Sequence, residues 1–141
     1  MKPSHKKLLA GAVTALTAIA VVVLPAVSAS AAISFRTNGS SSVGSVNSTT
    51  LSIPKPSGLA VGDFMVAMVT VQGGNTVTIS PPTENGTWTP IHRQDRTNQL
   101  SMATYRKFAT SDDVAETTFD FGVTGPNRRI SGGLIAYTGV D

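Results

Sequence analysis

Short runs of alternating apolar and polar residues, separated by turn-forming residues, fill the chain after residue 32. Where apolar residues recur at every second position, a strand with one buried face is expected. Glycine, proline, asparagine and aspartate cluster between these runs and indicate turns. The runs cover residues 33–37, 51–53, 63–72, 75–80, 87–95, 99–109, 117–123 and 130–140. The pattern therefore predicts about eight short strands.

The most apolar run, residues 63–72, reads DFMVAMVTVQ and is apolar on both faces. A buried helix is the alternative, but the run is short, rich in valine and bounded by Gly62 and Gly73, which favours a strand. A strand of this kind lies centrally and is covered on both sides, or it lies at the corner of a sandwich.

Two further details concern the second half of the chain. Residues 111–116 read SDDVAE and predict a loop or a single helical turn, for which Ser111 is a candidate cap. The adjacent Gly132 and Gly133 interrupt the last strand and predict a bulge or a close backbone approach. With many turns and no long helix after residue 31, the fold class expected is all-β, an antiparallel sandwich that is jelly-roll-like.

Residues 1–31 have the three parts of a secretory signal peptide. Lysines precede an apolar run from Leu8 to Leu24, and the small residues Ala29-Ser30-Ala31 follow it, so cleavage is expected after Ala31. An uncleaved membrane anchor is the alternative. The chain has no cysteine, which excludes a lipid-modified cysteine as anchor. We therefore expect a secreted β-sandwich domain at 32–141 that meets the membrane only through its signal peptide during export.

Removal of the signal peptide changes the charge balance. The whole chain has a net charge of +3, and three of its eleven basic residues are Lys2, Lys6 and Lys7. Eight basic residues then remain against eight acidic ones. The basic character belongs mostly to the signal peptide, so nucleic-acid binding is not expected.

Several stretches, in this order, resemble a family of exported bacterial and phage-tail proteins. They are the opening at Ile53 to Ala67, the turn from Pro81 to Trp88, YRKFA at 105–109, and IAYTGVD at 135–141. The resemblance implies a jelly-roll-like sandwich, often one module of a larger surface protein, and it brings no catalytic residues. In that family further strands follow the last motif, whereas this chain stops at Asp141. This departure from the family implies that the chain is a fragment, a truncated product or a minimal variant. If strands are missing, one edge of a sheet would be unpaired.

One histidine, His92, follows the signal peptide and is the candidate for a catalytic site. Asp95 is nearby in sequence, and serines are numerous. Residues of these three types could form the Ser-His-Asp triad of a hydrolase. There is no G-x-S-x-G motif, and a histidine near a strand end is usually an ordinary surface residue. A secreted hydrolase using His92 stays the alternative to a non-enzymatic protein.

The acidic residues Asp112, Asp113 and Glu116 are weak calcium candidates, because oxygen-rich loops can hold this ion. A solvated turn is the simpler interpretation. One histidine and no cysteine in the domain argue against zinc. No cofactor is expected.

Aromatic and basic residues provide the candidates for ligand binding. Trp88, Tyr105 and Tyr137 could stack on sugar rings, and Trp88, which follows the turn at Asn85-Gly86, is the one expected to be exposed. Core packing is the alternative for these rings. The pairs Arg128/Arg129 and Arg93/Arg96 could meet an anionic surface.

The function expected is therefore a secreted or cell-surface, non-enzymatic binding or structural module. Its predicted partner is a surface glycan or a cell-wall polymer, with Trp88, Tyr105, Arg128 and Arg129 as weak candidates for the site. A structural spacer from a larger surface protein is a further alternative.

Overall fold

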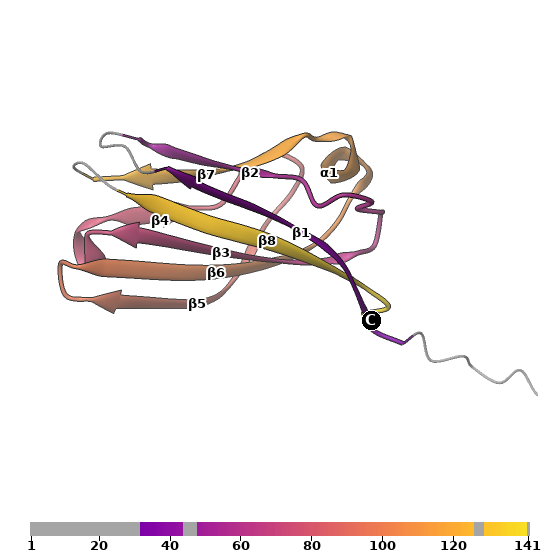
Figure 1. Cartoon of the computed structure of the whole chain (residues 1–141), viewed down its shortest axis with the longest axis horizontal. Helices are drawn as coiled ribbons and strands as arrows, with labels where there is room; N and C mark the ends of the chain where they lie inside the picture. The colour runs from indigo at the N-terminus through magenta and orange to yellow at the C-terminus, as the bar shows by residue number, and fades with distance from the viewer. Residues whose placement is uncertain (1–31, 44–47, 126–128, 141) are drawn as a thin grey trace, which may run out of the picture.

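The computed structural model describes residues 32–43, 48–125 and 129–140, and for residues 41–43 it describes the backbone alone. The predicted signal peptide lies outside these residues. The described part of the chain is an all-β sandwich of eight strands in two antiparallel sheets (Figure 1). The predicted fold class is thus confirmed.

The larger sheet has five strands in the order β1-β8-β3-β6-β5, and the smaller sheet has three in the order β2-β7-β4. In the larger sheet these are β1 (Ser34–Val43), β8 (Ile130–Thr138), β3 (Phe64–Gln72), β6 (Leu100–Phe108) and β5 (Thr89–Arg96). In the smaller sheet they are β2 (Thr50–Pro54), β7 (Thr118–Thr124) and β4 (Thr78–Ser80). The short helices η1 (Gly74–Thr76) and α1 (Ser111–Ala115) lie in connections, and α1 is the predicted helical turn.

The connections alternate between the sheets, and only β5 and β6 are joined as a hairpin within one sheet. This alternation produces the jelly-roll order, with β5 added to the edge of the larger sheet. The last strand, β8, lies between β1 and β3 and pairs with both. Strand β8 is therefore paired on both sides and is not an edge of the larger sheet.

Strand β1 is longer than predicted. Residues 38–43, which read NGSSSV and suggest a loop, continue the strand and pair with β8 in register from Asn38↔Ile135 to Val43↔Ile130. Ladder hydrogen bonds come from the backbone, so a polar sequence can join a sheet that a neighbouring strand has already begun. In the described part of the chain, no helix has the length and hydropathy to cross a membrane.

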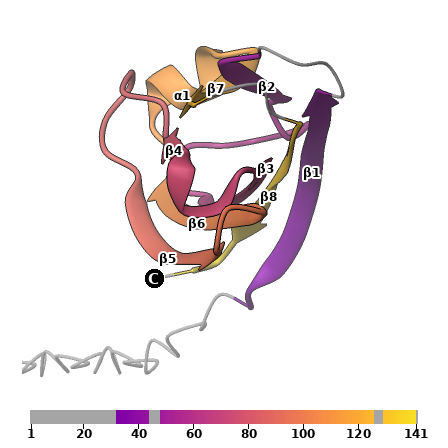
Figure 2. The ribbon, with the colours of Figure 1, turned by 90° about the vertical axis from the view of Figure 1, so that its left-hand side faces the viewer.

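The core fills the space between the two sheets, which Figure 2 shows nearly end on, with β2 and β7 in one layer and β5 and β6 in the other. Its largest buried side chains come from both layers, as the 10 Å spacing of packed sheets requires. They include Leu51, Ile53 and Phe121 from the smaller sheet and Met65, Val69, Val71, Ile130 and Leu134 from the larger one.

Strand β3 has one buried face and one partly open face. Met65, Ala67, Val69 and Val71 are fully buried, whereas Phe64 and Val66 are half-buried and Met68 is 48% exposed. Strand β3 lies centrally in the larger sheet, as predicted. Cover on both sides, one of the two predicted alternatives, is not found in the described residues, since only one face of β3 meets the other sheet. An apolar face indicates that its burial against another surface is favourable. It does not indicate whether that surface belongs to the same chain or to another molecule.

The glycine pair in β8 has the predicted close approach. A Cβ on Gly132 would lie 2.7 Å from Leu51 Cδ2 and 2.8 Å from the Met68 carbonyl oxygen, both too close. A Cβ on Gly133 would meet nothing nearer than 3.5 Å. Gly132 is therefore the position at which β2 of the smaller sheet packs directly on the larger sheet.

Candidate binding face on the larger sheet

Four aromatic residues form a row across the outer face of the larger sheet, the face turned away from the core. Register pairs Phe35 with Tyr137, Tyr137 with Phe64, and Phe64 with Phe108, so the row crosses β1, β8, β3 and β6. Its two ends are the most open, with Phe35 57% and Phe108 47% exposed. At strand spacings of about 4.8 Å, the row is roughly 14 Å long. We call these four residues the aromatic row.

The rings of the row contact one another in pairs. Phe35 and Tyr137 meet edge to face with centroids 6.0 Å apart, and Phe64 and Phe108 are tilted with centroids 5.1 Å apart. Such geometries are the favoured ones for aromatic pairs. The rings are thus held in place although much of their surface is open to solvent.

A β-bulge places Phe35 on this face. The register of β1 against β8 shifts between Phe35 and Thr37, so these two residues point to opposite faces although they are two apart in sequence. At this shift Arg36 has no partner residue in the register with β8, and its Nη2 donates to Asp63 Oδ1 at 2.9 Å. Asp63 is buried and also accepts from the backbone N–H of Ala60, so this ion pair fixes the bulge.

The rows that follow on the same face combine apolar and basic groups. Ile135, Val66 and Arg106 lie side by side in register, and the next row contains Met68, Thr104 and His92. Arg96 pairs with Leu100 further along the face. Among the described residues of this face, the charged side chains are basic, and none is a carboxylate.

A cavity of about 380 Å³ lies at the Phe108 end of the aromatic row. Phe64, Phe108 and Arg106 line it from the sheet, and the segment 85–89 contributes Asn85, Gly86, Thr87 and Thr89. This segment turns sharply because Asn85 and Gly86 both have positive φ, 63° and 99°, a conformation that asparagine tolerates and glycine adopts freely. The segment thereby brings the hydroxyl-bearing Thr87 and Thr89 to the rim of the cavity.

Trp88 and Tyr105, two of the predicted ligand-binding residues, lie in the core. Trp88 is 3% exposed and packs edge-on against Phe119 and Phe121, at centroid distances of 5.9 and 5.7 Å. Its predicted exposure is wrong. The turn at Asn85-Gly86 ends before it, and Trp88 reaches inward to fill the space between the sheets.

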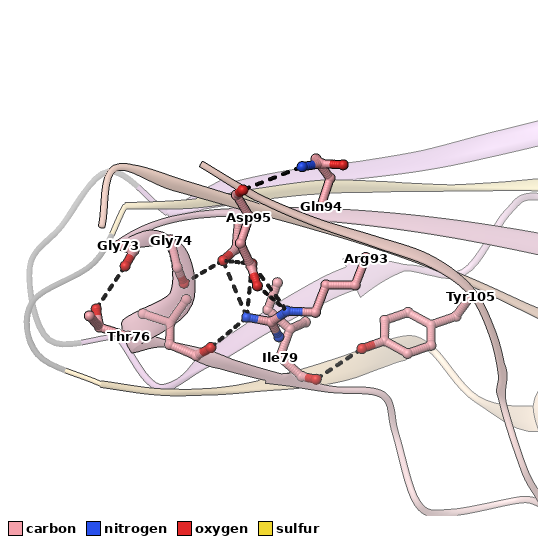
Figure 3. Close-up of polar contacts among 10 residues, drawn as sticks. Gly73, Gly74, Thr76, Ile79, Arg93, Gln94, Asp95 and Tyr105 are labelled. Carbon is pink, nitrogen blue, oxygen red and sulfur yellow. Dashed lines mark hydrogen bonds and ion pairs between the residues drawn. The ribbon is translucent and has the colours of Figure 1, made fainter. Parts of the chain in front are cut away.

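The hydroxyl of Tyr105 donates to the Ile79 carbonyl oxygen at 2.9 Å, as Figure 3 shows. Burial raises the pKa of Tyr105 above its ordinary value. Its ring is only 7% exposed, so it cannot stack on a ligand in this structure. Tyr137, the third aromatic residue considered, lies in the aromatic row.

The basic residues differ in how they are used. Arg93 bonds both carboxylate oxygens of Asp95 through Nε at 3.1 Å, and its Nη2 donates to the Val77 carbonyl oxygen at 2.7 Å (Figure 3). This hydrogen bonding from Arg93, and then from Ser101, lowers the pKa of Asp95. Arg129 is exposed just before β8, and Arg128 lies outside the described residues.

The three acidic residues considered for calcium do not converge. Asp113 is buried, and its Oδ1 accepts from Lys107 Nζ at 2.7 Å while its Oδ2 accepts from the backbone N–H of Thr110. Thr110, rather than the predicted Ser111, caps α1 in a capping box with Asp113. Glu116 instead accepts from Asn85 Nδ2 at 2.8 Å.

Asp112 is exposed. Within the described ranges, no three acidic or histidine side chains gather closely enough to hold a metal ion. The three weak calcium candidates are therefore not gathered into one group in the described part of the chain.

His92 and Asp95 point to opposite faces of the larger sheet. His92 pairs with Thr104 on the outer face, whereas Asp95 pairs with the buried Ser101 and bonds it. The dyad that the hydrolase alternative requires is not assembled. A second cavity, of about 520 Å³, lies against the smaller sheet, and its lining includes Glu84, Glu116 and Asp120.

The sequence alone did not identify Phe35, Phe64, Phe108 and Arg106 as site residues. The apolar character of both faces of β3 was the available signal. The sequence shows neither the bulge in β1 nor the register across the four strands, and these two features bring the rings together. Comparison with protein-family models, curated proteins and solved structures finds no significant match to this chain.

Proposed function

We propose that the protein is an exported, non-enzymatic binding module, and that the outer face of its larger sheet binds a surface glycan or cell-wall polymer. The aromatic row carries this proposal. Sugar rings present flat C–H faces, and exposed aromatic rings can cover these while neighbouring polar groups bond the hydroxyls. The row is exposed and lies across four strands of a rigid sheet, so binding requires little ordering of the protein.

Two further observations support the same proposal. The N-terminal segment has the pattern of a signal peptide, which would bring the domain to the cell surface or beyond. The opposed directions of His92 and Asp95 leave the hydrolase alternative without its dyad. A contiguous exposed apolar patch on a small domain is typical of a binding surface.

Binding to polysaccharides tests this proposal. The purified protein is titrated with soluble oligosaccharides by calorimetry and sedimented with insoluble glycans and peptidoglycan. The variant Phe35→Ala/Phe108→Ala, which removes both open ends of the row, should weaken binding at least about tenfold. Thr118→Ala, on the outer face of the smaller sheet, is the matched control and should bind as the natural protein does.

The oligomeric state distinguishes this from a protein-binding role. If light scattering shows a dimer that the double variant turns into a monomer, and no glycan binds, the row is an interface between two copies. That result would overturn the proposal.

A further inference from the structure

We infer that the binding face selects an acidic polymer, one whose repeat carries a carboxylate or a phosphate, and that Arg106 together with the cavity beside Phe108 binds the anionic unit. This inference rests on the proposed function, since it names the chemistry of the ligand that the aromatic row would bind.

Arg106 provides the first observation. It is exposed at the centre of the outer face, between Val66 of β3 and Thr89 of β5. Among the described residues, no carboxylate forms an ion pair with it, in contrast to Arg36 and Arg93. A guanidinium group presents two parallel N–H donors that match a carboxylate or a phosphate, so a free one on a binding face favours an anion.

The cavity beside Arg106 provides the second observation. Phe64 and Phe108 give it an aromatic wall, and Thr87 and Thr89 bring hydroxyl groups to its rim. A sugar ring stacked on Phe108 would hold its acidic substituent close to the guanidinium group. Lys107 also lines this cavity, but Asp113 neutralises its ammonium group, so the anion-binding charge comes from Arg106.

The distribution of charge over the molecule is the third observation. The outer face of the larger sheet carries Arg106, Arg96 and His92 and, in its described part, no acidic residue. The cavity on the smaller sheet is lined by Glu84, Glu116 and Asp120. The outer face thus carries positive charge from Arg106 and Arg96, and the cavity on the smaller sheet carries negative charge. Such a field attracts an anionic polymer to the aromatic row and gives no advantage with a neutral one.

The test compares three soluble probes of similar length: polygalacturonate, which carries carboxylates; poly(glycerol phosphate), which carries phosphates; and a neutral β-glucan. We expect at least one acidic probe to bind about tenfold or more tightly than the glucan, and more weakly as salt is raised. Arg106→Gln should remove this preference and leave glucan binding unchanged. Thr118→Glu, which changes the net charge by the same amount on the outer face of the smaller sheet, is the matched control and should keep the preference.

The variants separate failure of the inference from failure of the proposed function. Equal binding of acidic and neutral probes, unchanged by Arg106→Gln but lost in Phe108→Ala, would overturn the inference and leave the proposed glycan-binding face in place. Loss of acidic binding equally in Arg106→Gln and Thr118→Glu would also overturn it, because the attraction would then depend on net charge alone. If no probe binds, or Phe108→Ala binds all of them as before, both proposals fail. The stronger of the two acidic probes identifies the anion as carboxylate or phosphate.

Discussion

The molecule contains two groups of aromatic residues of similar size that lie in opposite environments. Trp88, Tyr105, Phe119 and Phe121 pack against each other between the sheets. Phe35, Phe64, Phe108 and Tyr137 form the aromatic row on the outer face of the larger sheet. The core group contains the chain's one tryptophan, and yet it is the outer group that solvent reaches. Ring type is thus a poor guide to exposure here, and strand register is a better one.

The sharpest test of this comparison removes one ring from each group. Trp88→Ala should lower the free energy of unfolding by about 3–5 kcal/mol, because it leaves a large cavity in the core. Phe108→Ala, at the open end of the row, should cost about 1 kcal/mol or less and should instead weaken ligand binding. Urea unfolding followed by circular dichroism measures both. Similar losses of stability in the two variants would show that the outer row also serves mainly to hold the fold together.

A second test uses two neighbours on β6 that point to opposite faces, Arg106 outward and Lys107 inward. Lys107 is buried against Asp113 and lies 5.9 Å from the centre of the Trp88 ring. Lys107→Met leaves the Asp113 carboxylate buried without its partner and should cost about 3–5 kcal/mol. Arg106→Gln should change stability by less than about 0.5 kcal/mol.

The double variant Lys107→Met/Asp113→Leu provides the control for this ion pair, because it removes both charges together. It should recover part of the loss, although Thr110 then loses its capping partner. A double variant less stable than Lys107→Met would mean that the capping interaction of Asp113 matters more than its charge.

The positions along the chain of most strands and of α1 could be predicted, because each depends on local sequence. The alternation in Phe119–Val123 and the turn residues that bound each run are sufficient to place a strand. The division of β3 into a covered and an open face could not be predicted, since both faces are apolar and the sequence does not show which one the other sheet covers. The same limit applies to Trp88, whose burial is decided by the packing of Phe119 and Phe121 across the core.

The candidate site was less accessible to prediction than the fold, because its residues come from four strands. Phe35 joins the row only because a bulge reverses the facing of β1, and no residue pattern in that segment announces the bulge. Among the described residues no carboxylate lies opposite Arg106 across the sheet, and this depends on the pairing of β6 with β3 and β5. Tyr137 was considered among the sugar-stacking candidates, and it is the one of those three that lies in the row.

The third test concerns how closely the two sheets approach. Gly132 lies beneath Leu51 of the smaller sheet, whereas Gly133, its neighbour, belongs to the outer face and has room for a methyl group. Gly132→Ala should cost about 1–3 kcal/mol through overpacking, and Gly133→Ala should be nearly neutral or slightly stabilising. Thermal melts of both variants measure this difference. Equal effects would mean that the sheets can separate enough to accept a methyl group without loss.

The smallest effect expected comes from Tyr105, the core ring with a polar group. Tyr105→Phe leaves the Ile79 carbonyl oxygen without this donor and should cost about 1 kcal/mol near neutral pH. Because burial raises the pKa of Tyr105 in the folded protein, the unfolded chain loses this proton first as the pH rises through about 10. The unfolded state then binds fewer protons than the folded state, so the stability contributed by the neutral hydroxyl is complete below that pH and declines above it. Urea unfolding between about pH 8 and about pH 11 should therefore show a decline for the natural protein that is shallower in Tyr105→Phe. An equally steep decline in the natural protein and in Tyr105→Phe would mean that other groups cause the loss of stability at alkaline pH. The Tyr105 ring would then differ from the rings of the outer row by its packing alone.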